Sequence, residues 1–112
     1  MKLFLDDLRA PPAEDWVVVR TVAQAQQEVL EHGVPDVLSF DHDLGEDEPD
    51  AMHFMNWLIN SHLDAELDLS KVTEVIIHSA NPPGADNLAG LWNGFAQYLG
   101  LNTTAIKAPR WD

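Results

Sequence analysis

Five short apolar runs, separated by segments of helical periodicity, constrain this chain more than any other feature. The runs are Lys2–Leu5, Trp16–Arg20, Asp36–Phe40, Lys71–Ile77 and Thr103–Lys107. Their length and their content of β-branched and aromatic residues are typical of buried strands. Strands that alternate with helices form a mostly parallel sheet, so the alternation predicts an α/β fold.

The segments between the runs carry helix start and stop signals. Thr21 and Gln24 form a capping box before the first helix, and Gly33 can end that helix. Pro49 suits the first turn of the second helix, and Asn81 can cap the third. The inner faces predicted from helical spacing are Val22, Ala25, Val29 and Leu30, then Met52, Met55, Leu58, Ile59 and Leu63, and finally Leu88, Leu91, Trp92, Phe95 and Leu99.

We expect a single domain over residues 1–112, because 112 residues are enough for one core and too few for two. The pattern suits a three-layer flavodoxin/receiver-like domain with strand order 2-1-3-4-5 and helices on both faces of the sheet. The link Leu8–Asp15 contains prolines and no helical pattern, which is short for a parallel crossover. Either this link is an extended crossover, or the second strand is an irregular edge.

The net charge is −13, from 19 acidic against six basic residues, and the chain has no cysteine. This charge excludes general DNA binding and leaves phosphate recognition to a local cation or a metal. It also allows a basic protein partner. No apolar run is long enough to span a membrane, and charge follows the start too early for a secretion signal. We therefore expect a cytoplasmic protein with no membrane partner.

Polar residues follow four of the five predicted strands. They are Asp6 and Asp7 after the first, Asp41, His42 and Asp43 after the third, His78, Ser79 and Asn81 after the fourth, and Lys107 at the end of the fifth. In an open parallel sheet, ligands bind beyond the carboxyl ends of the strands. The sequence therefore predicts one polar site at this edge of the sheet.

Carboxylates that meet at one edge repel one another unless a cation lies between them. The expected metal ligands are Asp6, Asp7, Asp41 and Asp43. Oxygen ligands suit Mg²⁺ or Mn²⁺, and we expect one of these ions as the cofactor. An EF-hand is excluded, because a glycine comes one place too early and Met52 occupies the position of the bidentate acid. A zinc site formed by His42, His78 and a carboxylate is the alternative.

The other polar residues at this edge can transfer protons or hold a phosphate group. Histidine titrates near neutral pH, so His42 and His78 are candidates for a general acid and a general base. Ser79 and Lys107 can bind phosphate oxygens.

Structural roles compete with each of these functional roles. Asp6 and Asp7 can end a strand in a turn. His78 can be a core histidine whose hydrogen bonds are satisfied inside the protein. Ser79 and Asn81 can simply cap the following helix.

The order of these residues resembles that of bacterial receiver domains. Those domains have an acidic pair after strand 1, a phosphoacceptor aspartate after strand 3, a Ser or Thr after strand 4 and a lysine after strand 5. The matching residues are Asp6, Asp7, Asp41, Ser79 and Lys107, with Pro109 near the proline that usually follows the lysine.

A closer resemblance is to the receiver-like family described as cyclic-phosphate processing. The matching segments are Leu5–Arg9 with Pro11 and Pro12, Trp16, Arg20–Thr21, Asp41–Gly45 and His78–Pro82. The resemblance covers most of the chain and implies processing of cyclic phosphate ends, such as the 2′,3′-cyclic ends of RNA. This chain is more acidic than typical members and lacks the arginine expected near Gly84–Asn87. The cations that remain available are Arg9, Arg20, Lys107 and Arg110.

Three functions are consistent with these observations. The first is a metal-dependent phosphoesterase that acts on a cyclic phosphate, either in a phosphate-containing small molecule or at an RNA end. Its catalytic residues would be His42, His78, Asp41, Ser79 and Lys107, and its phosphate ligands Arg9, Ser79, Asn81 and Lys107. The second is a phosphorylation switch with Asp41 as the acceptor. The third is a catalytically silent acidic protein that binds a basic partner or imitates nucleic acid, with Trp111 as a candidate contact.

Overall fold

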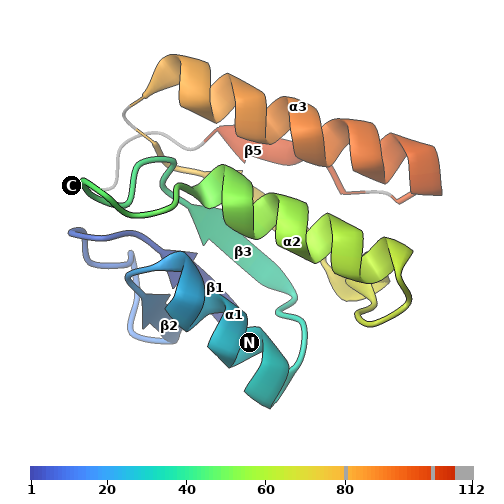
Figure 1. Ribbon diagram of the computed structural model, residues 1–112, viewed down its shortest axis with the longest axis horizontal. Coiled ribbons are helices and arrows are strands. Elements are labelled where there is room, and N and C mark those ends of the chain that lie inside the picture. The colour runs from blue at the N-terminus through green and yellow to red at the C-terminus, as the bar shows by residue number, and fades with distance from the viewer. Residues whose placement is uncertain (80, 102, 108–112) are drawn as a thin grey trace.

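The computed structural model describes residues 1–79, 81–101 and 103–107, which form a five-stranded sheet with three α-helices. The strands are β1 (Lys2–Leu5), β2 (Trp16–Val19), β3 (Val37–Phe40), β4 (Glu74–Ile77) and β5 (Ala105–Lys107). Their order is β2-β1-β3-β4-β5, and every neighbouring pair is parallel. The predicted α/β receiver-like fold and its strand order are confirmed (Figure 1).

The helices follow the strands from β2 onward. They are α1 (Val22–His32), α2 (Ala51–Leu63) and α3 (Pro82–Leu99), with a short 3₁₀ helix, η1 (Leu69–Lys71), before β4. The side chains of Thr21, Asp50 and Asn81 cap α1, α2 and α3. The prediction that Pro49 lies in the first turn of α2 is wrong, because Asp50 is the cap and the proline precedes it. The predicted fourth strand begins too early, because η1 occupies part of that segment.

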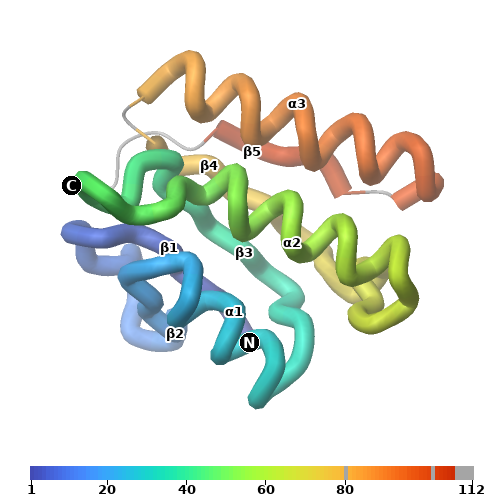
Figure 2. Tube along the Cα trace, in the orientation of Figure 1, coloured from blue at the N-terminus to red at the C-terminus, as the bar shows by residue number. Residues whose placement is uncertain are grey.

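All three helices cover one face of the sheet, where they lie side by side (Figure 2). The core between the layers combines alternate strand residues, such as Leu3, Leu5 and Phe40, with helix residues such as Phe54 and Trp92. Helices were expected on both faces of the sheet, but among the described residues the second face carries none. Among the described residues, none of the helices combines the length and the apolar composition that a membrane span requires.

The connection between β1 and β2 explains why the second face has no helix. It runs across the sheet in the direction opposite to the other three connections, so a right-handed crossover places it on the second face. This connection is short and contains Pro11 and Pro12, which lack a backbone N–H. β2 still pairs with β1 in regular register from Lys2–Trp16 to Leu5–Val19. The link is therefore an extended crossover, as one of the two alternatives predicts.

Two residues of the predicted inner faces are exposed instead. Leu30 of α1 is 66% exposed, and Leu63 of α2 is 57% exposed. α1 lies at the end of the helix layer, so the side that carries Leu30 faces solvent. Leu63 is the last residue of α2.

Candidate metal site

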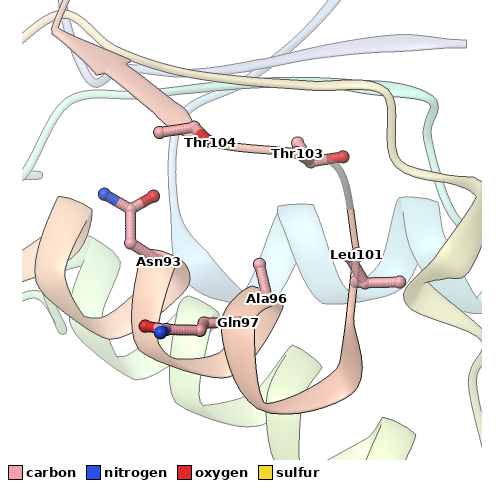
Figure 3. Close-up of a pocket in the computed structure, with 6 residues that line it drawn as sticks. All are labelled: Asn93, Ala96, Gln97, Leu101, Thr103 and Thr104. Carbon is pink, nitrogen blue, oxygen red and sulfur yellow. The ribbon is translucent and has the colours of Figure 1, made fainter.

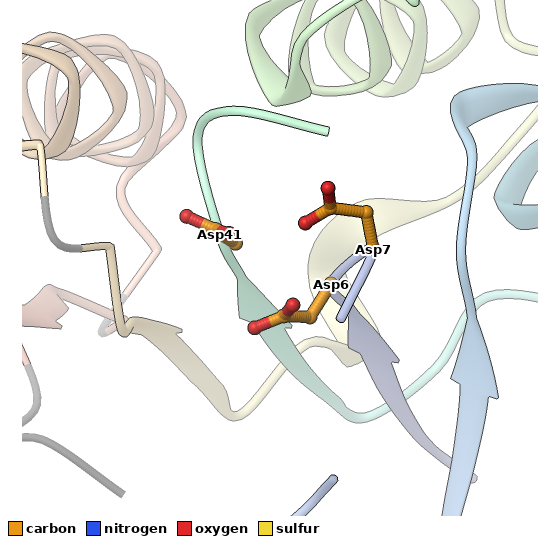
Figure 4. A group of neighbouring side chains, drawn as sticks. All are labelled: Asp6, Asp7 and Asp41. Carbon is orange, nitrogen blue, oxygen red and sulfur yellow. The ribbon is translucent and has the colours of Figure 1, made fainter. Parts of the chain in front are cut away.

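Three carboxylates meet at the carboxyl ends of β1 and β3 (Figure 4). Asp6 and Asp7 follow β1, and Asp41 follows β3, its neighbour in the sheet. One oxygen from each side chain lies within 4.8 Å of the others, close enough for all three to bind one ion. Backbone hydrogen bonds extend the sheet to these residues, from Asp6 N to Val19 O (3.1 Å) and from Asp41 N to Leu5 O (2.8 Å). The sheet itself therefore positions the cluster.

The cluster carries more negative charge than its surroundings neutralise. Burial raises the pKa of Asp41 to about 6, and the negative charges of Asp6 and Asp7 add to this rise. Arg9 and the hydroxyl of Ser79 act in the opposite direction. A divalent cation among the oxygens would lower this pKa again. A set of carboxylate oxygens that is short of positive charge fits Mg²⁺ or Mn²⁺.

Asp6 is the most restrained member of the cluster, and it is only 1% exposed. Its Oδ1 accepts hydrogen bonds from the backbone N–H groups of Leu8 and Arg9, both at 2.9 Å. Its Oδ2 lies 3.0 Å from Nε2 of His78. A carboxylate oxygen can accept two hydrogen bonds, so Oδ2 keeps one lone pair for a metal ion.

His78 is held at both ring nitrogens. Its Nε2 faces Asp6, its Nδ1 lies 2.6 Å from the Ser39 hydroxyl, and its ring stacks on Phe4 with 4.5 Å between centroids. Burial lowers the pKa of His78, which favours the neutral ring. A neutral ring beside the Asp6 carboxylate carries its proton on Nε2, so the Ser39 hydroxyl donates to Nδ1. This geometry makes His78 a support for Asp6, with only 1% of its own side chain exposed.

Sequence reasoning missed Ser39. The residue is fully buried in β3, with 0% of its surface exposed. A buried hydroxyl needs a hydrogen-bond partner, and this requirement was the available sequence signal. The partner, His78, is 39 residues further along the chain, so the pairing depends on the sheet.

Two arginines fix the loop that follows β1. Nη1 of Arg9 donates to the backbone carbonyl of His78 at 2.7 Å. Nη1 of Arg20 donates to the carbonyls of Asp6 (3.0 Å) and Arg9 (2.7 Å). Arg9 also lowers the pKa of Asp41, so its charge lies near the carboxylates. Arg20 instead holds the loop in place.

The structure does not bring Asp43 into the carboxylate cluster. Its side chain is 66% exposed and contacts Nδ1 of His42 at 2.9 Å and Nδ2 of Asn81 at 3.1 Å. The chain leaves the sheet after Asp41 and bends at His42, which turns Asp43 toward the start of α3. Within the described residues, the carboxylates that lie close enough to share one metal ion are therefore those of Asp6, Asp7 and Asp41.

His42 packs against the first turn of α3. A Cβ on Gly84 would lie 2.5 Å from Cγ of His42, so only glycine permits this approach. The backbone carbonyl of His42 accepts from Ala51 N at 2.9 Å, and its Nε2 lies 3.7 Å from Oδ2 of Asp50. His42 therefore links the first turns of α2 and α3 beside the strand edge.

We expect Gly84→Ala to push the His42 ring out of its position, because the rigid imidazole cannot bend away from the added methyl group. The cost should be about 1–3 kcal/mol of unfolding free energy, measured by urea denaturation. The matched control is Gly90→Ala on the same helix, where a Cβ meets nothing within 4 Å. Removal of a helical glycine there should stabilise the protein by roughly 0.5–1 kcal/mol. Equal effects at the two positions would contradict the packing of His42.

Lys107 forms an ion pair with Asp86 of α3, so the structure does not bring it to the three carboxylates. Both side chains are exposed, and β5 is the edge strand furthest from β2. The remaining residues singled out near the C-terminus are Pro109, Arg110 and Trp111, which lie outside the described residues.

A cavity of about 330 Å³ lies between α3 and the segment that precedes β5 (Figure 3). Its lining residues are Asn93, Ala96, Gln97, Leu101, Thr103 and Thr104. The two threonines precede β5, so the cavity is at the amino ends of the strands, opposite the cluster. Its described lining is uncharged.

The sequence model of a known family, the cyclic-phosphate processing receiver domain, matches residues 1–94 of this chain. The match contains the three carboxylates, His42, Ser39 and the segment around His78, whereas β5 and Lys107 lie beyond it. No curated protein and no solved structure matched the chain.

Proposed function

This chain belongs to the cyclic-phosphate processing receiver domain family, and on that premise we propose that it hydrolyses a cyclic phosphate with the help of a divalent metal ion. The proposal depends on one observation, the meeting of an oxygen from each of Asp6, Asp7 and Asp41 within 4.8 Å. These three residues would hold Mg²⁺ or Mn²⁺. When bound, such an ion polarises a phosphoryl oxygen and lowers the pKa of a coordinated water.

The reaction opens the ring of a cyclic phosphodiester. The oxygen of a water molecule bonds to phosphorus, and one of the two P–O bonds within the ring breaks. The water gives up a proton and the released oxygen takes one up, so the product is a phosphomonoester with a free hydroxyl. We assign the donated proton to His42, because its side chain is 13% exposed at the strand edge, whereas that of His78 is 1% exposed and held at both nitrogens.

Other side chains would bind and orient the phosphate group. The charge of Arg9 lies near Asp41, and the Ser79 hydroxyl is close enough to lower the pKa of Asp41 through a hydrogen bond. The backbone N–H of Asn81 donates to Oγ of Ser79 at 3.0 Å, so Asn81 would orient that hydroxyl. Lys107 does not belong to this set, because its side chain forms an ion pair with Asp86 of α3.

With Mg²⁺ or Mn²⁺ present, we expect the protein to convert a 2′,3′-cyclic mononucleotide to a monophosphate, which ³¹P NMR detects directly. His42→Gln should slow this conversion by about 100-fold or more, because it removes the general acid. The matched control is His53→Gln, since His53 also contacts Asp50 but is 67% exposed on α2. An unchanged rate in His42→Gln would exclude His42 as the acid. Absence of turnover with the metal bound would refute the hydrolase.

One observation favours a second function, a phosphorylation switch. Asp41 is partly accessible at the end of β3, with the Ser79 hydroxyl beside it, as a phosphoacceptor would require. Against it, Lys107 is paired with Asp86 instead of facing the acceptor. Incubation with acetyl phosphate and Mg²⁺, followed by intact-mass analysis, separates the two functions. A stable gain of one phosphoryl group that Asp41→Asn abolishes would favour the switch.

A further inference from the structure

We infer that the substrate is a small molecule with a single phosphate group and not the end of an RNA chain. This inference rests on the cyclic-phosphate chemistry proposed above and concerns the surface that surrounds the site. It follows from the signs of the charges on that surface, which decide how the rest of a substrate can approach.

An acidic lip, formed by Asp43, Glu46, Asp47, Glu48 and Asp50, borders the carboxylate cluster. Gly45 lies between the two, because a Cβ on it would be 3.7 Å from Oδ2 of Asp7 and 3.9 Å from Cγ of Glu48. Leu44 is 3% exposed and anchors the lip in the core. The carbonyl of Gly45 accepts from Glu48 N at 3.3 Å, which closes the turn. The negative charges are therefore held next to the site.

The cations of the described residues do not form a track for a second phosphate. Lys2, at the amino end of β1, pairs with Asp15 at 3.0 Å, and Lys71 ends η1 before β4. Both lie at the edge of the sheet opposite the site. Lys107, the last residue of β5, pairs with Asp86 of α3.

Apart from Lys107, which pairs with Asp86, the described cations at the carboxyl edge are Arg9 and Arg20, and both already hold the loop after β1. Each uses Nη1 to bind backbone carbonyls, either of that loop or of His78, which follows β4. Arg9 still lies beside the cluster, because its backbone N–H donates to Oδ1 of Asp6 and its Nη1 to the carbonyl of His78, whose ring contacts the same Asp6. Together with a divalent ion, Arg9 would give a single phosphate group direct contacts with positive charge.

Proteins bind nucleic-acid chains mainly by neutralising successive phosphates with lysine and arginine. Here the phosphates next to a cyclic end would approach the acidic lip, on a chain of net charge −13. Each such phosphate adds repulsion, whereas a cyclic mononucleotide brings a single negative charge, on the group that would contact the metal ion and Arg9. The surface thus selects against a polyanion.

The test compares a 2′,3′-cyclic mononucleotide with an oligonucleotide that ends in the same cyclic nucleotide, at constant Mg²⁺. We expect kcat/KM for the mononucleotide to exceed that for the oligonucleotide by at least about tenfold at low salt. Raising the KCl concentration should narrow this gap, because salt screens the repulsion between exposed charges. The corresponding mononucleotide and oligonucleotide with an open 3′-phosphate are not hydrolysed further. Their dissociation constants, measured by NMR titration, should differ in the same direction.

Two triple variants test whether the acidic lip is responsible. The first neutralises the lip with Glu46→Gln, Asp47→Asn and Glu48→Gln. The second removes the same charge at the far ends of α1 and α2 with Glu31→Gln, Asp64→Asn and Glu66→Gln. We expect the lip variant to improve kcat/KM for the oligonucleotide several-fold, and the control variant to change it much less. Neither variant should alter turnover of the mononucleotide by more than about twofold.

Two results would overturn the inference in different ways. If the oligonucleotide is the better substrate and its affinity falls as salt rises, the substrate class is wrong while the hydrolase stands. If neither substrate is opened, the proposed function fails and this inference fails with it. Equal gains from the two triple variants would show that net charge alone, and not the acidic lip, determines the preference.

Discussion

Replacing Asp41 by asparagine is expected to abolish metal binding and turnover while making the metal-free protein more stable at neutral pH. The pKa of Asp41 is raised from 3.8 to about 6 in the folded protein, mainly by burial. A carboxyl group with a raised pKa favours the folded state when protonated, which holds fully below pH 3.8. That contribution is lost as the pH rises through about 6, and the ionised group then opposes folding. Asparagine avoids this cost.

We expect Asp41→Asn to add about 1–2 kcal/mol to the unfolding free energy at pH 7.5 and almost nothing at pH 4, after a discount for the partial exposure of Asp41. Urea denaturation without metal at the two pH values measures this difference. Mg²⁺ should then stabilise the wild type but not the variant. Asp43→Asn is the matched control, because Asp43 lies outside the cluster. A variant that is no more stable at pH 7.5 than the wild type would contradict the charge imbalance at the site.

The second large effect is expected from His78→Leu, which should lower the unfolding free energy by about 3 kcal/mol. The substitution leaves Oδ2 of Asp6 and the hydroxyl of Ser39 buried without the ring nitrogens that they contact. Ser39→Ala removes only the outer member of this chain and should cost about 1 kcal/mol. Asp6 would lose its fixed orientation in His78→Leu, so we expect Mn²⁺ affinity to fall by about 10- to 100-fold.

Urea denaturation and Mn²⁺ titration by paramagnetic NMR broadening separate the stability effect from the metal effect. The matched control is His32→Leu, since His32 is exposed on α1 and pairs only with a surface glutamate, Glu28, in the contacts described. It should stay within about 0.5 kcal/mol of the wild type. If His78→Leu still folds and binds Mn²⁺ with unchanged affinity, His78 does not position Asp6.

The fold and the place of the site could be read from the chain because both depend on local patterns. Alternation of strand and helix signals predicted the sheet, and polar residues after the strands marked its carboxyl edge. The predictions that were wrong concern how the helices are surrounded in the folded protein. Leu30 matches the apolar period of α1 but lies at the open end of the helix layer. The second helix layer did not follow from the fold type, because the connection from β1 to β2 is too short to hold a helix.

The sequence by itself determined which residues could carry the chemistry, since residue type and position after a strand are local properties. Only the tertiary structure decided which of them meet. It brings Asp6 to His78 across 72 positions and His78 to Ser39 across 39, and it leaves Asp43 outside the cluster. Hydrogen bonds and ion binding require contact within a few ångströms. Such contacts are set by the register of neighbouring strands and by bends after them, which no local pattern in the chain specifies.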